Sequence, residues 1–312
     1  MEEITCTNLD RAIEEYKSFG YRLDMIFPAD NPREALVSKD GERLRLSLQK
    51  PAREQGRNLD VDQYALADAQ ASAIDEWIVG RAGMEYRDLI PDRMNGKVIA
   101  SHIRLRTAGE VPDYVHYHKI DFQMIYCKRG RIRVVYEDQG PPFWLETGDC
   151  VLQPPEIRHR VLECTAGAEV IEVSMPAEHE TWVEHDIELP TRSRNPSRDF
   201  NGQCFMRHIA AESSWMTSDL KDFEERRTGI AFAAGGLVDL RVLRSKAEKP
   251  VTVESTSKTD ILLYFVLTGS VFLTLGGQAE REIAADNGFL LEKGTEYSIR
   301  MSERSELLSF AA

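Results

Sequence analysis

Residues 116–130 of the chain read HYHKIDFQMIYCKRG. His116 and His118 stand two residues apart, and Gln123 follows in a run that is otherwise typical of a β-strand. Side chains two residues apart in a strand point to the same face, so the two imidazoles project together. The stretch therefore indicates a metal site in which a neutral amide stands where a carboxylate would be expected.

A third histidine can join this pair. His159 ends the stretch GDCVLQPPEIRH, residues 148–159, in which a Gly-Asp pair predicts a tight turn and a Pro-Pro pair ends a strand. The chain can thereby return alongside His116 and His118. Three neutral imidazoles inside a β-barrel suit one divalent transition metal, with Fe, Zn, Mn, Ni and Cu as the alternatives.

The spacing of these residues resembles the first signature motif of the cupin superfamily, G-x5-H-x-H-x3-4-E-x6-G. Gly109, His116, His118 and Gly130 match it, with one additional residue after the first glycine. Gln123 occupies the position of the glutamate. This substitution removes one negative charge from the ligand set, so the metal would be a stronger Lewis acid and would favour an anionic ligand.

The second cupin motif, G-x5-P-x-G-x2-H-x3-N, is matched at Gly148, Pro154 and His159. Glu156 and Glu163 replace its glycine and its asparagine. The resemblance implies that the three histidines hold the metal, with Fe(II) favoured. Gln123 would then be a fourth ligand or would hold a metal-bound water.

Two further residues are candidates for a catalytic role. Glu163 has the same strand parity as His159, so it could face the barrel interior as a general base or as a residue that orients a metal ligand, or it could lie at the strand end in solvent. Tyr114 shares a face with His116 and could line the mouth of the site or only pack there. We expect His179 and His185 to lie in a solvated surface segment, with a second metal site as the alternative.

The strand-rich pattern occurs twice along the chain. KVIASHIRLRTAGE corresponds to GLVDLRVLRSKAEK, and FQMIYCKRGRIRVVY to DILLYFVLTGSVFLTL, which predicts a duplicated domain. In the second copy the ligand positions hold Ser255, Ser257, Leu262 and Tyr297. These side chains cannot replace imidazoles around such a metal, so we expect a metal-free barrel that is structural or binds a ligand.

The N-terminal residues predict a strand, the helix LDRAIEEYKSFG and three more strands, in the order β-α-β-β-β. This order resembles a half-module of the glyoxalase/bleomycin-resistance (vicinal oxygen chelate) superfamily. The segment contains no histidine, so we expect it to serve in packing or dimerisation rather than in metal binding.

The predicted fold is mainly β, with two tandem cupin (double-stranded β-helix, jelly-roll) barrels preceded by a small α/β module of βαβββ order. A helix is expected at residues 61–80 and another around 209–225. The predicted boundaries are the half-module at 1–55, a helical connector at 56–83, the metal-binding barrel at 84–190, a linker with a helix at 191–225, and the second barrel at 226–312.

Composition limits the partners. The chain of 312 residues carries a formal net charge of −13, which argues against nucleic acid and anionic membranes as partners. The sequence has no apolar run of the roughly 18 residues that a membrane span needs, and its acidic start does not resemble a signal peptide. Five widely spaced cysteines favour free thiols, and together these features predict a cytoplasmic protein.

The resemblance implies an enzyme. Our leading hypothesis is a mononuclear three-histidine dioxygenase of the quercetinase, diketone-cleaving or thiol-oxidising kind, which acts on a small anionic or chelating organic substrate together with O2. The alternatives are a non-redox isomerase, cyclase or lyase that uses its metal as a Lewis acid, and a protein that binds a metabolite without turnover. Exposed strand edges and the half-module suggest a homodimer.

Overall fold

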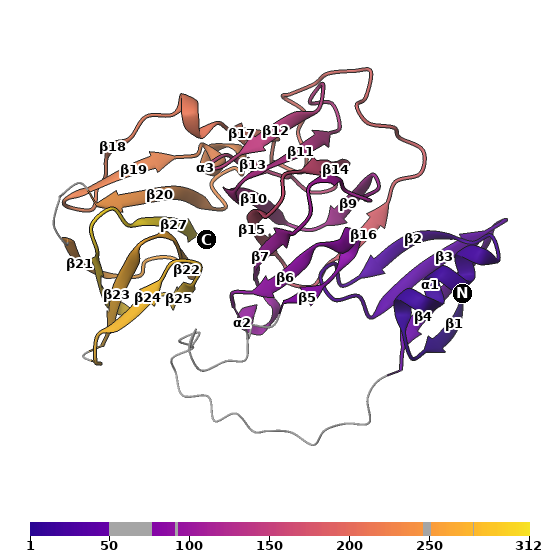
Figure 1. Ribbon diagram of the computed structural model, residues 1–312, viewed down its shortest axis with the longest axis horizontal. Helices are drawn as coiled ribbons and strands as arrows, with labels where there is room; N and C mark the ends of the chain where they lie inside the picture. Colours follow the sequence, from indigo (N-terminus) through magenta and orange to yellow (C-terminus); the bar gives the residue numbers. More distant parts are fainter. Residues whose placement is uncertain (50–76, 91–92, 246–250, 277) are drawn as a thin grey trace.

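The computed structural model describes residues 1–49, 77–90, 93–245, 251–276 and 278–312. Figure 1 shows two β-barrels beside each other, with a small α/β module that extends from the first barrel. The predicted fold class is confirmed. None of the helices formed by these residues is long and apolar enough to cross a membrane.

The N-terminal module has the predicted order of elements. They are β1 (Glu2–Cys6), α1 (Leu9–Ser18), β2 (Arg22–Phe27), β3 (Glu34–Lys39) and β4 (Glu42–Leu48). Asn8 caps the helix, because its side-chain oxygen accepts a hydrogen bond from the backbone N–H of Arg11 at 2.8 Å. Leu9 and Ile13 of the helix pack against the sheet. The resemblance of this module to the vicinal oxygen chelate superfamily stays a prediction.

The first barrel consists of two sheets. Its strands are β5 (Ile78–Val79), β6 (Glu85–Asp88), β7 (Ile99–Leu105), β8 (Gly109–Glu110), β9 (His116–Lys119), β10 (Phe122–Arg129), β11 (Arg131–Tyr136), β12 (Phe143–Glu146), β13 (Cys150–Leu152), β14 (His159–Cys164), β15 (Ala168–Met175), β16 (Glu180–Val183) and β17 (Met206–His208). One sheet has the order β17-β13-β10-β15-β7-β6-β5. The other runs β2-β16-β9-β14-β11-β12 and continues from β2 into the N-terminal module.

This continuity gives the N-terminal module a structural role. Met25 pairs with Trp182 and Ile26 with Thr181, so β2 adds directly to β16. β16 in turn pairs with β9, the strand that carries His116 and His118. The module therefore covers an edge of the sheet that carries these two histidines, an edge that would otherwise be open to other strands.

The second barrel also has two sheets. Its strands are β18 (Met216–Thr217), β19 (Phe223–Arg227), β20 (Asp239–Ser245), β21 (Val251–Thr256), β22 (Ile261–Thr268), β23 (Ser270–Leu275), β24 (Arg281–Ala284), β25 (Gly288–Glu292), β26 (Glu296–Met301) and β27 (Glu306–Ala311). The sheet orders are β18-β19-β20-β27-β22-β25 and β21-β26-β23-β24. The register supports the predicted duplication, since His116 pairs with His159 and, at the aligned positions, Ser255 pairs with Tyr297.

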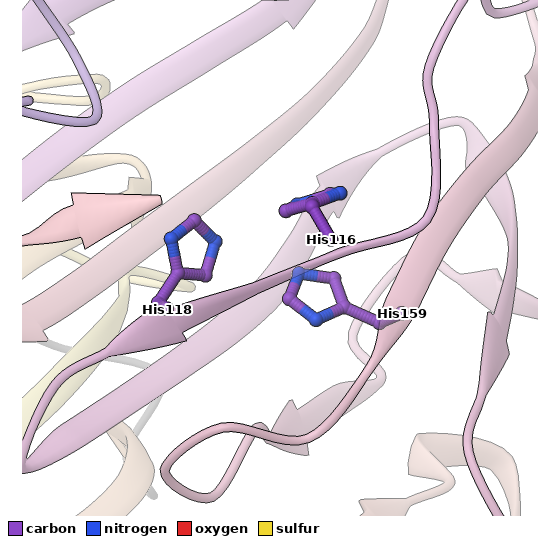
Figure 2. Close-up of side chains that lie close together, drawn as sticks. All are labelled: His116, His118 and His159. Atoms are coloured by element: carbon purple, nitrogen blue, oxygen red, sulfur yellow. The ribbon is translucent and has the colours of Figure 1, made fainter. Parts of the chain in front are cut away.

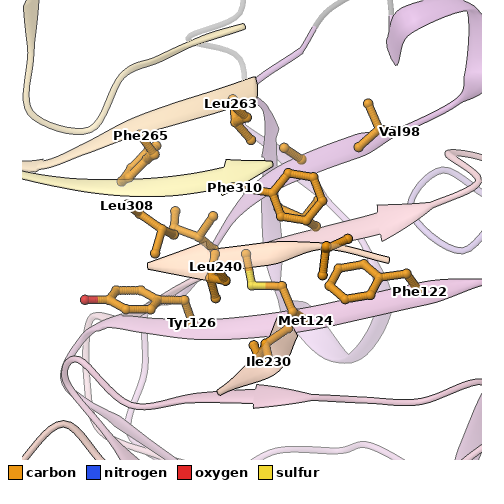
Figure 3. Close-up of a cluster of buried hydrophobic side chains, with 14 of the residues drawn as sticks. Val98, Phe122, Met124, Tyr126, Ile230, Leu240, Leu263, Phe265, Leu308 and Phe310 are labelled. Carbon is orange, nitrogen blue, oxygen red and sulfur yellow. The ribbon is translucent and has the colours of Figure 1, made fainter. Parts of the chain in front are cut away.

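A shared hydrophobic core joins the two barrels. Figure 3 shows Phe122 and Met124 of β10 near Leu308 and Phe310 of β27. The rings of Phe122 and Phe310 lie 5.7 Å apart. β10 is therefore buried on both faces, one towards the interior of its own barrel and the other towards the second barrel.

Two helix predictions need correction. Of the helix predicted at 61–80, residues 61–76 lie outside the described part of the chain, and the remainder forms β5, followed by the 3-10 turn η1 (Arg81–Gly83). Residues 209–225 form the short turn η2 (Ala210–Glu212), β18 and the start of β19 instead of a helix. Strand pairing outweighs local preference here, because Glu224 and Glu225 bind arginines of β20. In the described part of the chain, the remaining helices are α2 (Arg93–Gly96) and α3 (Ile230–Ala233).

Candidate metal centre

Three imidazoles meet inside the first barrel, as Figure 2 shows. His116 and His118 project from β9, and His159 from the neighbouring strand β14, where it pairs with His116. All three side chains are buried, and one nitrogen from each lies within 4.8 Å of the others. The structure therefore brings together the three histidines that the sequence singled out.

Each imidazole has a hydrogen-bond partner at Nδ1, so Nε2 is the nitrogen that could bind a metal, and the amide nitrogen of Gln153 lies 3.4 Å from Nε2 of His159. Nδ1 of His116 lies 2.8 Å from the carbonyl oxygen of Tyr114, and Nδ1 of His159 lies 2.9 Å from that of Ile157. A carbonyl only accepts, so these Nδ1 atoms carry the proton and the Nε2 atoms carry the lone pair. Nε2 of His116 is buried without a hydrogen-bond partner. Such an orphaned acceptor is what a metal-binding imidazole presents before it meets its ion.

The third histidine is held by a side chain. Nδ1 of His118 lies 2.8 Å from Oγ1 of Thr181 on β16. Thr181 is placed there because it pairs with His118 across the two strands. The sequence analysis did not single out Thr181, since nothing in the local pattern shows that β16 adds to β9.

Burial keeps the three imidazoles neutral. It lowers the pKa of His159 to about 4, and it lowers the pKa values of His116 and His118 well below their usual range. The nearby Arg81 guanidinium contributes in the same direction for each. Neutral imidazole is the form that binds a metal, so the donor set fits a divalent transition metal at neutral pH.

Gln123 lies next to the histidines and is buried on β10. Its Oε1 accepts a hydrogen bond from Nε2 of Gln153 at 2.8 Å, and its Nε2 donates to Oε1 of Glu172 at 3.1 Å. Nε2 of Gln153 lies 3.4 Å from Nε2 of His159. Gln123 is thus close to the proposed metal position, and its direct ligation stays a prediction.

Glu172 supplies a carboxylate that the sequence analysis missed. It lies on β15, opposite Ile125 of β10, and lines the same cavity as the histidines. Burial raises the pKa of Glu172, against the opposing effect of its hydrogen bonds with Gln123 and Ser174. The only signal in the sequence is a glutamate within AEVIEVSM, a strand that is buried on both faces.

Arg81 brings a positive charge to the cavity. It projects from η1, is paired with the fully buried Asp113, and places one guanidinium nitrogen 3.4 Å from Nδ1 of His116. Asp113 also accepts hydrogen bonds from the backbone N–H groups of Tyr114 at 2.9 Å and Val161 at 3.0 Å. Burial alone would lower the pKa of Arg81, but Asp113 raises it, so the guanidinium stays charged.

The cavity between these residues is small, about 60 Å³. Its polar lining includes the three histidines, Arg81, Gln123, Tyr136, Gln153, Arg160 and Glu172. The rest of the wall is apolar, with Met84, Ile103, Ile125, Val134 and Val170 among its side chains. A few convergent polar groups in an apolar pocket are typical of a site for a small molecule.

Glu163 does not join the site. The pairing of β11 with β14 shifts between Val134, opposite Val161, and Arg133, opposite Glu163, so Leu162 is an additional residue in β14. This β-bulge reverses the parity that the sequence analysis assumed. Glu163 therefore faces away from the cavity, partly exposed, 3.5 Å from Arg133.

Tyr114 packs against the site without lining the cavity. Its ring lies 5.8 Å from that of His116 in an edge-to-face arrangement, and the Arg81 guanidinium lies 5.7 Å from the centre of the Tyr114 ring. Its carbonyl, rather than its hydroxyl, contacts His116. The arrangement supports the packing alternative, and the Tyr114 carbonyl in addition orients the His116 ring.

His179 is not on a solvated surface, and the expectation for it was wrong. It is buried at the start of β16, and its ring lies 5.2 Å from that of His118. β16 lies between β9 and β2 in the sheet and pairs with both, so the residues at its start are covered by neighbouring strands. His185 is more exposed and lies 3.0 Å from the carbonyl oxygen of Leu23.

The second barrel differs at the aligned positions, as predicted. Leu262 and Tyr297 lie in its hydrophobic core, and the hydroxyl of Tyr297 lies 3.4 Å from that of Tyr264. Within the described ranges, the three histidines of the first barrel form the one cluster of metal-binding side chains. Apolar packing thus fills the space that the metal site takes in the first barrel.

No protein-family model matches the chain, and no curated protein matches it significantly. Several solved structures, in contrast, have a similar fold. Protein Ylba from E. coli, of family DUF861, is 10% identical with a TM-score of 0.53, over 76% of this chain and 86% of that chain. A variant of B. subtilis oxalate decarboxylase is 12% identical with a TM-score of 0.54, over 75% and 74%. These similarities support the two-barrel fold, and identities this low show the fold alone.

Proposed function

We propose that this protein is an enzyme that holds one divalent metal ion in its first barrel and acts on a small organic anion. His116, His118 and His159 would bind the metal through Nε2, with Fe(II) favoured over Zn, Mn, Ni or Cu. Gln123 would be the fourth ligand or the partner of a metal-bound water. The observation that carries the proposal is the convergence of three buried, neutral imidazoles, each held through Nδ1.

The cavity favours a small anion as substrate. Arg81 has one nitrogen directed at Asp113 and His116, and its guanidinium has further N–H donors for a carboxylate or enolate. The three imidazole ligands are neutral, so a negative ligand on the metal would not be repelled by them. A cavity of about 60 Å³ is small for a flavonol and suits a short carboxylate, a diketone enolate or a thiolate.

Oxygenation is the reaction we favour. A metal held by three neutral imidazoles would offer open positions for substrate and O2, and as Fe(II) it would activate O2 while the substrate supplies the electrons overall. A dioxygenase places both oxygen atoms in the substrate and therefore needs no external reductant. The apolar wall formed by Ile103, Ile125 and Val170 would keep bulk water from the reacting atoms.

Glu172 favours a second candidate, a non-redox lyase. Its carboxyl group lines the cavity, and its raised pKa would allow it to hold a proton beside the substrate. A decarboxylation needs such a proton at the carbon that loses CO2. Oxalate decarboxylase, which shares the fold, is named for a reaction of this kind.

The test uses protein purified without oxygen and loaded with Fe(II) or Mn(II). It is screened against short mono- and dicarboxylates, 2-oxo acids, diketones and thiols, with dissolved O2 and released CO2 followed together. Consumption of O2 in proportion to substrate supports the dioxygenase, and anaerobic turnover supports the lyase. Protein carrying His118→Ala, treated in the same way, is the control.

Two outcomes contradict the proposal. If neither metal-loaded form turns over any compound of the panel, the enzyme hypothesis fails, and a rise in Tm with an unconsumed ligand would point to a binding protein instead. If the His118→Ala protein retained both metal and activity, the assignment of the site would be wrong.

A further inference from the structure

We propose that Glu172 is a positioning residue that fixes the orientation of the Gln123 amide, so that its oxygen and not its NH2 group is available to the metal. This inference rests on the metal centre proposed above and identifies a role for a residue outside the three-histidine set. It also explains how a neutral amide can take the position of a carboxylate ligand.

A directional chain of hydrogen bonds carries the argument. Oη of Tyr136 donates to Oε1 of Gln153 at 2.5 Å, and Nε2 of Gln153 donates to Oε1 of Gln123 at 2.8 Å. Nε2 of Gln123 then donates to Oε1 of Glu172 at 3.1 Å. Ser174 also donates to this oxygen, at 3.2 Å. Tyr136, Gln153, Gln123 and Ser174 are all buried, so water does not compete along the chain.

The carboxylate sets the direction of the whole chain. Oε1 of Glu172 also accepts from Ser174, so this oxygen faces Gln123 as an acceptor and Gln123 must present its NH2 group to it. Its oxygen then lies on the opposite side, towards Gln153, which must donate to it. The oxygen of Gln153 is left for the Tyr136 hydroxyl. Without Glu172 the amide group of either glutamine could rotate by 180° and exchange its oxygen with its NH2 group, because the two groups are nearly equal in size.

The direction matters for a cation. An amide oxygen is a hard donor that can bind a metal or a metal-bound water, whereas an NH2 group directs positive hydrogens at the ion. The oxygen of Gln123 keeps a second lone pair beyond its bond from Gln153. Nε2 of Gln153 lies 3.4 Å from Nε2 of His159, and once that nitrogen is bound to the ion the second N–H of Gln153 could donate to an anion at the metal.

Glu172 also places a carboxyl group in the cavity although position 123 has none. Ile125 of β10 lies opposite Glu172 of β15, and Gln123 lies opposite Ser174. The carboxylate is thus displaced by one strand from the ligand position of the motif. This geometry predicts that the two residues can exchange roles.

The test compares metal binding in four variants. Glu172→Ala removes the hydrogen-bond acceptor. Glu172→Gln replaces the carboxylate by an amide, which can either donate to Gln123 or accept from it. The exchange variant, Gln123→Glu with Glu172→Gln, returns the carboxylate to position 123. Glu146→Gln is the matched control, since Glu146 lies on β12 in an exposed pair with Arg131. Each protein is titrated with Co(II) alone, and the affinity and visible absorption spectrum are recorded, with apoprotein Tm as a check of folding.

We expect Glu172→Ala to weaken Co(II) binding roughly 10- to 100-fold, as is typical when the partner of a ligand is lost. Glu172→Gln should show a smaller loss and a changed spectrum. The exchange variant should bind at least as tightly as wild type, because the amide introduced at position 172 would donate to the carboxylate introduced at position 123. The chain of hydrogen bonds would then remain satisfied. The control should match wild type.

The design separates a failure of the role of Glu172 from a failure of the proposed metal centre. If wild type binds one equivalent of Co(II) and both single variants bind it with unchanged affinity and spectrum, the role of Glu172 is refuted. If the Glu172→Ala apoprotein does not fold, a lack of rescue by a folded exchange variant refutes it instead. If wild type itself binds no Co(II), the proposed metal centre is refuted and this inference falls with it.

Discussion

Replacing Arg81 by methionine tests the charge arrangement of the site. The Arg81 side chain is 15% exposed and that of Asp113 is 0% exposed, so the substitution would leave a buried carboxylate without its counter-charge. Breaking such a pair from one side typically costs about 3–5 kcal/mol. Asp113 keeps its hydrogen bonds from the backbone N–H groups of Tyr114 and Val161, so we expect a loss near the lower end of this range.

The measurement is urea unfolding of the apoprotein, followed by tryptophan fluorescence and circular dichroism together. Arg300→Met is the matched control, because Arg300 and Glu280 form a pair that is 34% and 44% exposed. Removing that pair should cost no more than about 1 kcal/mol. An equal, small loss in both variants would refute the reasoning, because it would show that water solvates Asp113 as readily as Glu280.

The same substitution tests the proposed substrate class. A hydrogen bond to a charged group contributes about 1.5–3 kcal/mol, so the metal-loaded Arg81→Met protein should bind a small carboxylate roughly 10- to 150-fold more weakly. Its affinity for the metal alone should change far less, because Arg81 supplies no ligand atom. Isothermal titration with the anion and with the metal separates the two effects. An unchanged anion affinity would contradict a role for Arg81 in substrate binding.

Three further predictions concern other parts of the molecule. Thr181→Val removes the oxygen 2.8 Å from Nδ1 of His118 and should weaken Co(II) binding roughly 10- to 100-fold, and an unchanged affinity would show that the ring needs no anchor. Phe310→Ala, in the core between the barrels, should lower the free energy of unfolding by about 3–5 kcal/mol in a urea titration. A loss below about 1 kcal/mol would mean that packing between the barrels contributes little to the stability of either. Burial lowers the pKa of His102 to about 4, below its value of about 6.5 in the unfolded chain, so its contribution is complete above about pH 6.5 and is lost as the pH falls towards 4. The free energy of unfolding, plotted against pH, should therefore rise more steeply between about pH 4 and 6.5 in wild type than in His102→Gln. Parallel pH profiles of the two proteins would contradict the assignment.

Much of the architecture followed from local patterns. Short strand-like runs between turn signals predicted strands such as β10 and β15, and ligand spacing predicted that His116 and His118 share a face. The aligned repeats predicted that the second barrel lacks the histidines, and Leu262 and Tyr297 indeed lie in its core. These features depend on neighbours in sequence or on repetition, both of which a single sequence displays.

The rest of the site depends on which strands become neighbours. Thr181 reaches His118 only because β16 adds to β9, and Glu172 reaches Gln123 only because β15 lies beside β10. Arg81 enters from a turn in a region predicted as helical. Glu163 was misplaced because a single additional residue, Leu162, reverses the parity of β14, and no composition signal marks that bulge. Each of these contacts is set by tertiary pairing and not by local preference.

The most direct test of the account is anomalous diffraction from crystals of the metal-loaded protein, recorded at the absorption edge of the bound metal. The account predicts one peak per chain, about 2.0–2.3 Å from Nε2 of His116, His118 and His159, and none in the second barrel. The absence of a peak between these three nitrogens, or a peak bound by other residues instead, would contradict the central claim that the first barrel is a metal centre.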